Sequence, residues 1–282
     1  MKEKIAIVTD STCDLSKDVL SDKGIEFLPL KIIFKDSEYR DRIDISPQEV
    51  YDNFENEIPS TSMPSPEEIS NKYNELKDKG YTHIISIHIS SGLSGTYNTC
   101  KMASREVQGI KIEIIDSKML SMGLGRLVLY ANHLIESGDY NFNQIVKKVK
   151  EKINKIDLFF IVDTLKYLKE GGRIGKVRGT IAELLNIKPI ISINDEGEYY
   201  TFDKVRTRKK SIKYLVNIAQ DKINEGLCFV DVMHADAKEE AINILDKLKD
   251  LKNVKESFLG EISPAMVVHS GPGLIGVCIT KD

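Results

Sequence analysis

The stretch that most restricts the fold is a strand, a polar turn and a helix in immediate succession. The mainly apolar run Ile84–Ile89 indicates a buried strand, the turn is Ser90–Thr96, and a helical pattern covers Tyr97–Val107. The turn has four hydroxyls, two glycines and no charge. Because a helix N-terminus exposes unpaired N–H groups, and hydroxyls add neutral donors, this turn is a candidate anion site. A capped helix after a buried strand explains the same residues, and both interpretations stay open here.

The order of strand and helix repeats through the first half of the chain. Apolar runs predict strands at 5–9, 82–89, 111–115 and 158–162, with an extended segment at 28–34; helical patterns, two of them opened by capping boxes, lie at 15–23, 46–56, 65–80, 123–136 and 141–155. This alternation indicates a mainly parallel sheet with helices on both faces. Ligands of such sheets sit at the carboxyl ends of the strands, where Asp10–Thr12, Ser90–Thr96 and Asp116–Ser117 lie.

The pattern changes after Val162, which indicates a second domain. Short helices are predicted at 163–170 and 180–185, longer ones after Arg206 and at 239–248, and strands at 189–193, 199–203, 228–233, 254–259 and 275–279, with a hairpin turn at 194–197. The fold class expected is α/β with two domains, an N-terminal domain over 1–160 and a C-terminal α+β domain over 161–282. We expect the two halves to pack together with the ligand in a cleft between them.

Composition excludes several classes of function. The chain has 282 residues and a net charge of −3, with Lys and Arg spread along it, so we expect no nucleic acid partner. No apolar run approaches the roughly 20 residues of a membrane span. Met1–Lys4 leads straight into a strand rather than a signal peptide, and the four cysteines lack metal spacing. We therefore expect a cytoplasmic protein with reduced thiols and no metal site.

Several stretches of the chain resemble familiar catalytic motifs, but their context differs. The glycines of Gly271–Gly276 match a dinucleotide pattern, but a strand rather than a helix follows. No phosphate-binding loop ending in Gly-Lys-Ser/Thr occurs, which argues against a self-contained kinase. Gly92–Gly95 is similar to a hydrolase elbow without its final spacing residue, and His269 or His234 would be the base for Ser94. A lipid or acyl-ester hydrolase using Ser94 is therefore the alternative function.

A set of short motifs, spread over the whole chain and weak one by one, is specific in combination. The motifs are Asp10-Ser11-Thr12, Thr61-Ser62-Met63-Pro64-Ser65, Ser91-Gly92-Leu93-Ser94-Gly95-Thr96-Tyr97, Asp163-Thr164-Leu165, Gly171-Gly172-Arg173-Ile174, Lys188-Pro189 and His269-Ser270-Gly271-Pro272-Gly273. Together they resemble the DegV family, the FakB-type bacterial fatty-acid-binding proteins that present acyl chains to a fatty acid kinase. Met63 and Ser270 depart from the family, which often has Gln and Thr there.

The resemblance implies a lipid-binding carrier rather than an enzyme, with no cofactor and no catalytic residue of its own. It implies that Thr61 and Ser94 hold the carboxylate of a long-chain fatty acid, and that Arg206 and His269 extend the polar network. The kinase would supply ATP and metal, form the acyl phosphate, and dock near Arg173. Two glycines precede Arg173, so we expect a mobile and exposed cation there.

Overall fold

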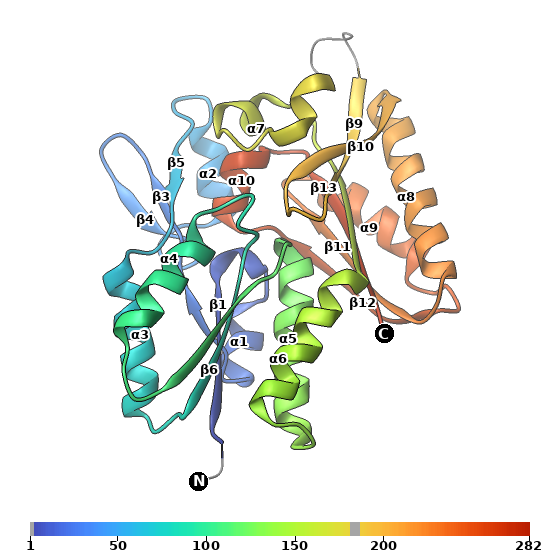
Figure 1. The fold of residues 1–282 in the computed structure, drawn as a ribbon. Coiled ribbons are helices and arrows are strands. Elements are labelled where there is room, and N and C mark those ends of the chain that lie inside the picture. The colour runs from blue at the N-terminus through green and yellow to red at the C-terminus, as the bar shows by residue number, and fades with distance from the viewer. Residues whose placement is uncertain (1–2, 181–186) are drawn as a thin grey trace. The chain divides into compact units, whose positions relative to one another are not determined.

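The computed structural model describes residues 3–180 and 187–282, so residues 181–185 of the helix predicted at 180–185 lie outside the described residues. The chain forms two compact units, residues 1–31 with 62–154 and residues 32–61 with 155–282 (Figure 1). The division expected at residue 160 assigned 32–61 to the first half, whereas the structure groups this segment with the C-terminal half. Its long-range contacts, described below, are the reason.

The first unit contains the predicted parallel sheet. Its strand order is β2-β1-β6-β7, from Glu26–Leu28, Ile5–Asp10, His83–His88 and Lys111–Asp116, and every neighbouring pair is parallel. The helices are α1 (Lys17–Asp22), α3 (Pro66–Asp78), α4 (Thr96–Ala103), α5 (Ser121–Ser137) and α6 (Phe142–Lys152), with 3-10 turns at Ser11–Cys13, Ser104–Glu106 and Ile153–Lys155. Helices α3 and α4 cover one face, and α5 packs against β1 and β6. The prediction of a parallel sheet flanked by helices is confirmed.

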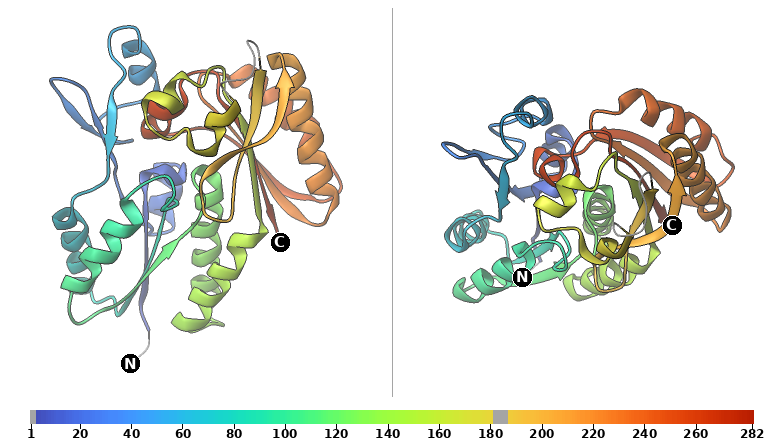
Figure 2. Two further views of the ribbon diagram at one scale, coloured as in Figure 1. Left: turned by 45° about the horizontal axis from the view of Figure 1, so that its top comes forward. Right: turned by 90° about the horizontal axis from the view of Figure 1, so that it is seen from above.

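The second unit is built on a six-stranded mixed sheet. Its order is β10-β9-β8-β13-β11-β12, from Tyr199–Arg206, Ile187–Ile193, Ile156–Ile161, Ile275–Lys281, Cys228–His234 and Val254–Glu261, and the pairings are antiparallel except for β11 with β12. Its helices include α7 (Lys166–Glu170), α8 (Arg208–Asn224), α9 (Lys238–Leu248) and α10 (Pro264–Ser270), with a 3-10 turn at Gly175–Thr180. Helices α8 and α9 lie side by side over one face of the sheet and share its apolar core (Figure 2). The predicted α+β character of this half of the chain is confirmed.

Segment 32–61 belongs to the second unit because it is bonded to the region around α10. It carries α2 (Pro47–Asn53) and most of a small sheet of order β4-β3-β5, from Glu38–Arg40, Lys31–Ile33 and Ser60–Ser62. The carboxylate of Asp41 accepts the backbone N–H of Ala265 at 3.1 Å, in the first turn of α10. The hydroxyl of Tyr51 donates to Glu261 at 3.0 Å. No helix of the described ranges is long and apolar enough to cross a membrane.

A chain of buried polar groups lies under the strand ends of the first unit. One oxygen of Asp10 lies 3.0 Å from His88 Nδ1 and accepts the Ile89 N–H at 2.9 Å, while the other accepts the Thr12 hydroxyl at 2.5 Å. His88 Nε2 lies 2.7 Å from the hydroxyl of Ser86. Asp10, His88 and Ser86 are fully buried. Burial alone lowers the pKa of His88, but its neighbours Cys100 and Asp10 outweigh burial and raise it to about 10. His88 and Asp10 therefore form a buried ion pair, and their other polar atoms also have hydrogen-bond partners.

This network predicts a loss of stability in alkali. Because the pKa of His88 is raised from 6.5 to about 10 on folding, its contribution is complete below about pH 6.5 and is lost as pH rises through about 10. We expect the free energy of unfolding to fall by on the order of a few kcal/mol between about pH 7 and 10. Denaturant titrations at several pH values check this. The fall should shrink in His88→Gln and persist in His133→Gln, which changes an exposed histidine. Equal slopes in all three proteins would contradict the assignment.

Candidate functional site

The Ser90–Thr96 loop is held by residues at the ends of two neighbouring strands, β1 and β7, and by Met119. Asp10, at the end of β1, accepts the N–H of Ile89 just before the loop. Asp116, at the end of β7, accepts the backbone N–H of Ser91 at 3.1 Å and its hydroxyl at 2.5 Å. The N–H of Ser90 donates to Met119 O at 2.8 Å. The loop that the sequence singled out is thus fixed at the carboxyl edge of the parallel sheet, as this sheet type predicts.

Ser94 lies at the open end of this loop, directly before α4. Its half-buried hydroxyl lies 2.9 Å from the hydroxyl of Thr96 and accepts the Thr96 N–H at 3.3 Å. Gly95 precedes α4 without a side-chain cap, and a Cβ there would lie 2.9 Å from Met63 Sδ. Met63 is 43% exposed and accepts a hydrogen bond from Thr99. The first helical turn of α4 is therefore covered by an apolar side chain, and Ser94 is the hydroxyl presented beside it.

Thr61 and His269 form a pair in the second unit. Thr61 lies on β5 and His269 near the end of α10, and the Thr61 hydroxyl is 2.7 Å from His269 Nε2. Both side chains are half-buried. Two residues that the resemblance named, 208 positions apart in the chain, are thus in direct contact.

The other side of the His269 ring is enclosed by Gly171. A Cβ at residue 171 would lie only 2.1 Å from His269 Nδ1, so no other side chain fits there without displacing the ring. His269 Nδ1 is buried and has no hydrogen-bond partner among the described residues. Burial, followed by the positive charge of Arg173, lowers the pKa of His269 to about 3. The imidazole is therefore neutral at physiological pH.

The ring's proton is best assigned to Nε2. An unpaired buried acceptor is tolerated better than an unpaired buried N–H, and the nearby Arg173 cation favours a lone pair on Nδ1. In this tautomer His269 donates to the Thr61 oxygen, which leaves the Thr61 hydroxyl hydrogen available to an outside acceptor. The pair is thus an oriented, uncharged hydrogen-bond donor.

Arg173 is not the mobile, exposed cation that the sequence predicted. Its side chain is half-buried, and Nη1 donates to the carbonyl oxygen of Gly171 at 2.6 Å. The guanidinium folds back on its own loop, in which Gly172 has a positive φ of 71° that favours glycine. Arg173 therefore acts electrostatically on His269, and its docking role stays a prediction.

Arg206 and its neighbour Arg208 differ sharply. Arg206 is exposed at the end of β10, and its side chain makes no hydrogen bond or ion pair within the described part of the chain, so its role at the site stays a prediction. Arg208 binds Glu240 through Nε and Nη2, and its Nη1 donates to Gly273 O at 2.8 Å, which fixes the loop after α10. The role of Arg208 was not predicted from the sequence, because charge and spacing do not distinguish two arginines separated by one residue.

The geometry gives no support to the hydrolase alternative. The hydroxyl of Ser94 is bonded to Thr96 rather than to an imidazole. A pKa of about 3 makes His269 a poor general base, and burial also lowers the pKa of His234. No three acidic, histidine or cysteine side chains of the described residues gather in a way that would hold a metal ion.

Gly171→Ala tests how the His269 ring is held. The new methyl group would displace the ring from Thr61, so we expect the free energy of unfolding to fall by about 1–3 kcal/mol. In a His269→Ala background the same change should cost little, because the clashing atom is gone. Denaturant midpoints of the wild type, the two single variants and the double variant give the coupling energy between positions 171 and 269. If Gly171→Ala lowers the free energy of unfolding equally in both backgrounds, the methyl group strains the backbone rather than displacing the ring.

Comparison with known proteins shows the family of this chain. The family model named DegV, described as an uncharacterised protein family, matches residues 4–282. A DegV domain-containing protein of Clostridium acetobutylicum is 48% identical over 99% of this chain and 100% of its own. Two solved structures are similar in fold: a DegV family protein of Thermus thermophilus (TM-score 0.93, 28% identity, 99% and 100% coverage) and DegV of Bacillus subtilis (0.92, 32%, 100% of both). Both are described as binding fatty acid. This chain belongs to the DegV family.

Proposed function

We propose that this protein binds a long-chain fatty acid and presents its carboxylate to a fatty acid kinase in the cytoplasm, which converts it to acyl phosphate. The observation that carries the proposal is the Thr61–His269 pair, an oriented neutral donor that suits a carboxylate oxygen. The fatty-acid-binding DegV proteins of the same fold support the choice of ligand. The kinase partner rests on the family resemblance.

The affinity of such a site would come from the acyl chain. Each buried CH₂ contributes about 0.8 kcal/mol, so a long chain outweighs any one hydrogen bond at the head group. The head group contacts then set orientation. Ser94 would give a second neutral hydroxyl to the carboxylate, and the ligand's place between the two halves of the chain stays a prediction.

Neutral donors also suit the reaction. In the proposed transfer a carboxylate oxygen attacks the γ-phosphorus of ATP on the kinase, the bond to the ADP oxygen breaks, and acyl phosphate and ADP result. An ammonium or guanidinium bound tightly to that oxygen would reduce its nucleophilicity, whereas hydroxyls hold it with less charge withdrawal. The low pKa of His269 keeps the imidazole in the neutral form that this role needs.

The two hydroxyls are tested by removal. Thr61→Ala and Ser94→Ala should each weaken fatty acid binding by about 1–1.5 kcal/mol, roughly 5- to 12-fold, because each loses one hydrogen bond. Thr61→Ser keeps the hydroxyl and should bind almost normally. Competition with a fluorescent fatty acid measures affinity, native mass spectrometry reports the lipid carried through purification, and melting temperature controls for folding. Unchanged affinity in the double mutant would remove the carboxylate from these residues, and no bound lipid in the wild type would sink the proposed function.

Arg173 separates binding from transfer. We expect Arg173→Ala to keep its bound lipid and melting temperature while acyl phosphate formation with the kinase slows by on the order of tenfold, because the local cation for docking is gone. Arg173→Lys keeps the charge and should recover part of the rate. Kinase-coupled turnover measured beside lipid content decides it. Loss of lipid and turnover together would assign Arg173 to the ligand site through His269.

A further inference from the structure

A concentrated positive charge lies where β10 runs into α8. Residues 204–213 contain six Lys or Arg and no Asp or Glu, although the whole chain has a net charge of −3. The rest of the chain therefore carries −9 against +6 in this one segment. Arg208 is neutralised by Glu240. The exposed remainder, here called the basic face, consists of Lys204, Arg206, Lys209, Lys210 and Lys213.

The basic face differs from the lysines of this protein that are paired with carboxylates. Lys72, Lys79 and Lys222 each lie within ion-pair distance of two carboxylates. In the described ranges, by contrast, Lys209, Lys210 and Lys213 have no acidic partner. An intramolecular role therefore does not account for these three ammonium groups.

The position of these charges on α8 is unfavourable for folding. The first turn of α8 contains Arg208, Lys209 and Lys210, no acidic residue and no side-chain cap. Cations at this end of a helix are repelled by the helix dipole. Thr207, immediately before the helix, has a φ of 69°, which is strained for a β-branched residue. These two features lower the stability of the segment, and binding of an acidic partner would offset that loss.

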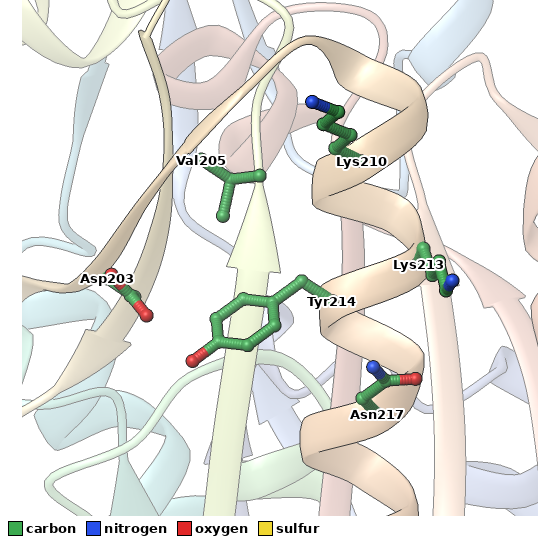
Figure 3. A pocket seen from close by; sticks show the side chains of 6 residues that line it. All are labelled: Asp203, Val205, Lys210, Lys213, Tyr214 and Asn217. Carbon is green, nitrogen blue, oxygen red and sulfur yellow. The ribbon is translucent and has the colours of Figure 1, made fainter.

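A hollow between β10 and α8 gives the basic face a shape as well as a charge (Figure 3). It has a volume of about 300 Å³ and is lined by Asp203, Val205, Lys210, Lys213, Tyr214 and Asn217. Lys210 reaches from α8 towards β10, and the Tyr214 ring points across the gap towards Asp203. Tyr214 and Asp203 interact, since the Tyr214 hydroxyl lowers the pKa of the Asp203 carboxyl. The hollow thus mixes cations with an amide, a ring and a carboxylate.

This mixture favours an acidic protein surface over a phosphate-rich one. The Asp203 carboxylate would repel a dense array of phosphates, such as a nucleic acid backbone or an anionic membrane, whereas a protein surface supplies discrete carboxylates with donors between them. Lys210 and Lys213 would take the carboxylates, and Asn217 and Asp203 would bind neighbouring donors. The hollow is separate in sequence from Thr61, Ser94, Arg173 and His269.

We propose that the basic face, centred on Lys209, Lys210 and Lys213, is a docking surface for an acidic face of the kinase that phosphorylates the bound ligand. This inference rests on the proposed function and adds a contact to the one predicted at Arg173. Because the protein as a whole is negative, attraction between the two proteins must come from a local patch of this kind. Such contacts speed association and weaken with salt.

The test is a charge reversal, Lys209→Glu/Lys210→Glu/Lys213→Glu, in the full-length protein. Its control is Lys17→Glu/Lys23→Glu/Lys155→Glu, which makes the same change in net charge at three other exposed lysines. Binding to the purified fatty acid kinase of the source organism is measured by interferometry at about 50 mM and about 300 mM NaCl. Fatty acid affinity and melting temperature are measured on the same samples.

We expect the α8 triple variant to bind the kinase at least about tenfold more weakly at low salt, with most of the salt dependence gone and fatty acid affinity unchanged. Its melting temperature should stay the same or rise, since acidic residues suit a helix N-terminus. The control should bind the kinase almost as the wild type does. Equal weakening in both variants would mean a general charge effect and overturn the proposal.

Three other outcomes also overturn it. The first is unchanged kinase binding in the α8 variant. The second is loss of binding to vesicles of phosphatidylglycerol and phosphatidylcholine with kinase binding intact, which would make the basic face a membrane contact. The third is a wild type that does not bind the kinase. In that case the fatty acid assay shows whether the lipid-binding part of the proposed function stands without this partner.

Discussion

The hydrogen bond between Thr61 and His269 is the contact on which the candidate site depends. It joins two residues 208 positions apart, and several other features serve to place its two ends. Asp41 accepts an N–H from the first turn of α10, and Tyr51 donates to Glu261. These two bonds fix the position of segment 32–61, which carries Thr61 on β5. Gly171 leaves just enough room for the ring of His269. Arg208 holds the carbonyl of Gly273 beyond it. The two atoms of this 2.7 Å contact are thus positioned by residues outside the pair.

The charge state of this pair is as important as its position. Burial together with the Arg173 cation keeps His269 neutral, so the site offers hydrogen bonds without a formal positive charge. The buried His88 is in the opposite charge state, since Cys100 and the Asp10 carboxylate help to keep it protonated. The pKa values of these two histidines therefore shift in opposite directions, because burial and the Arg173 cation lower that of His269, whereas Cys100 and Asp10 outweigh burial and raise that of His88.

Much of the fold follows from local sequence patterns. The strands of the first unit and the loop at Ser90–Thr96 could be predicted because apolar runs, turn residues and capping boxes are short-range signals. Thr61 and His269 were each named through the family resemblance rather than through spacing, and their direct contact was not predicted. The attachment of segment 32–61 to α10 could not be predicted, because contacts across more than 200 residues leave no local pattern. The folding back of Arg173 and the choice between Arg206 and Arg208 depend on side-chain conformations that one sequence does not specify.

The interleaving of the two units has a consequence for synthesis of the chain. The chain passes from one unit to the other after residues 31, 61 and 154. Segment 32–61 leaves the ribosome more than 200 residues before Glu261, Ala265 and His269, to which it bonds. Until those residues are made, the sheet β4-β3-β5 lacks its bonds to the region around α10, and its two outer strands are edges that are prone to pair with other chains. Once residue 154 has been made, the first unit can complete its parallel sheet and fold. Segment 32–61 is then a loop with both ends attached to the folded first unit. Such a tether limits the search that α10 must make when it finally emerges.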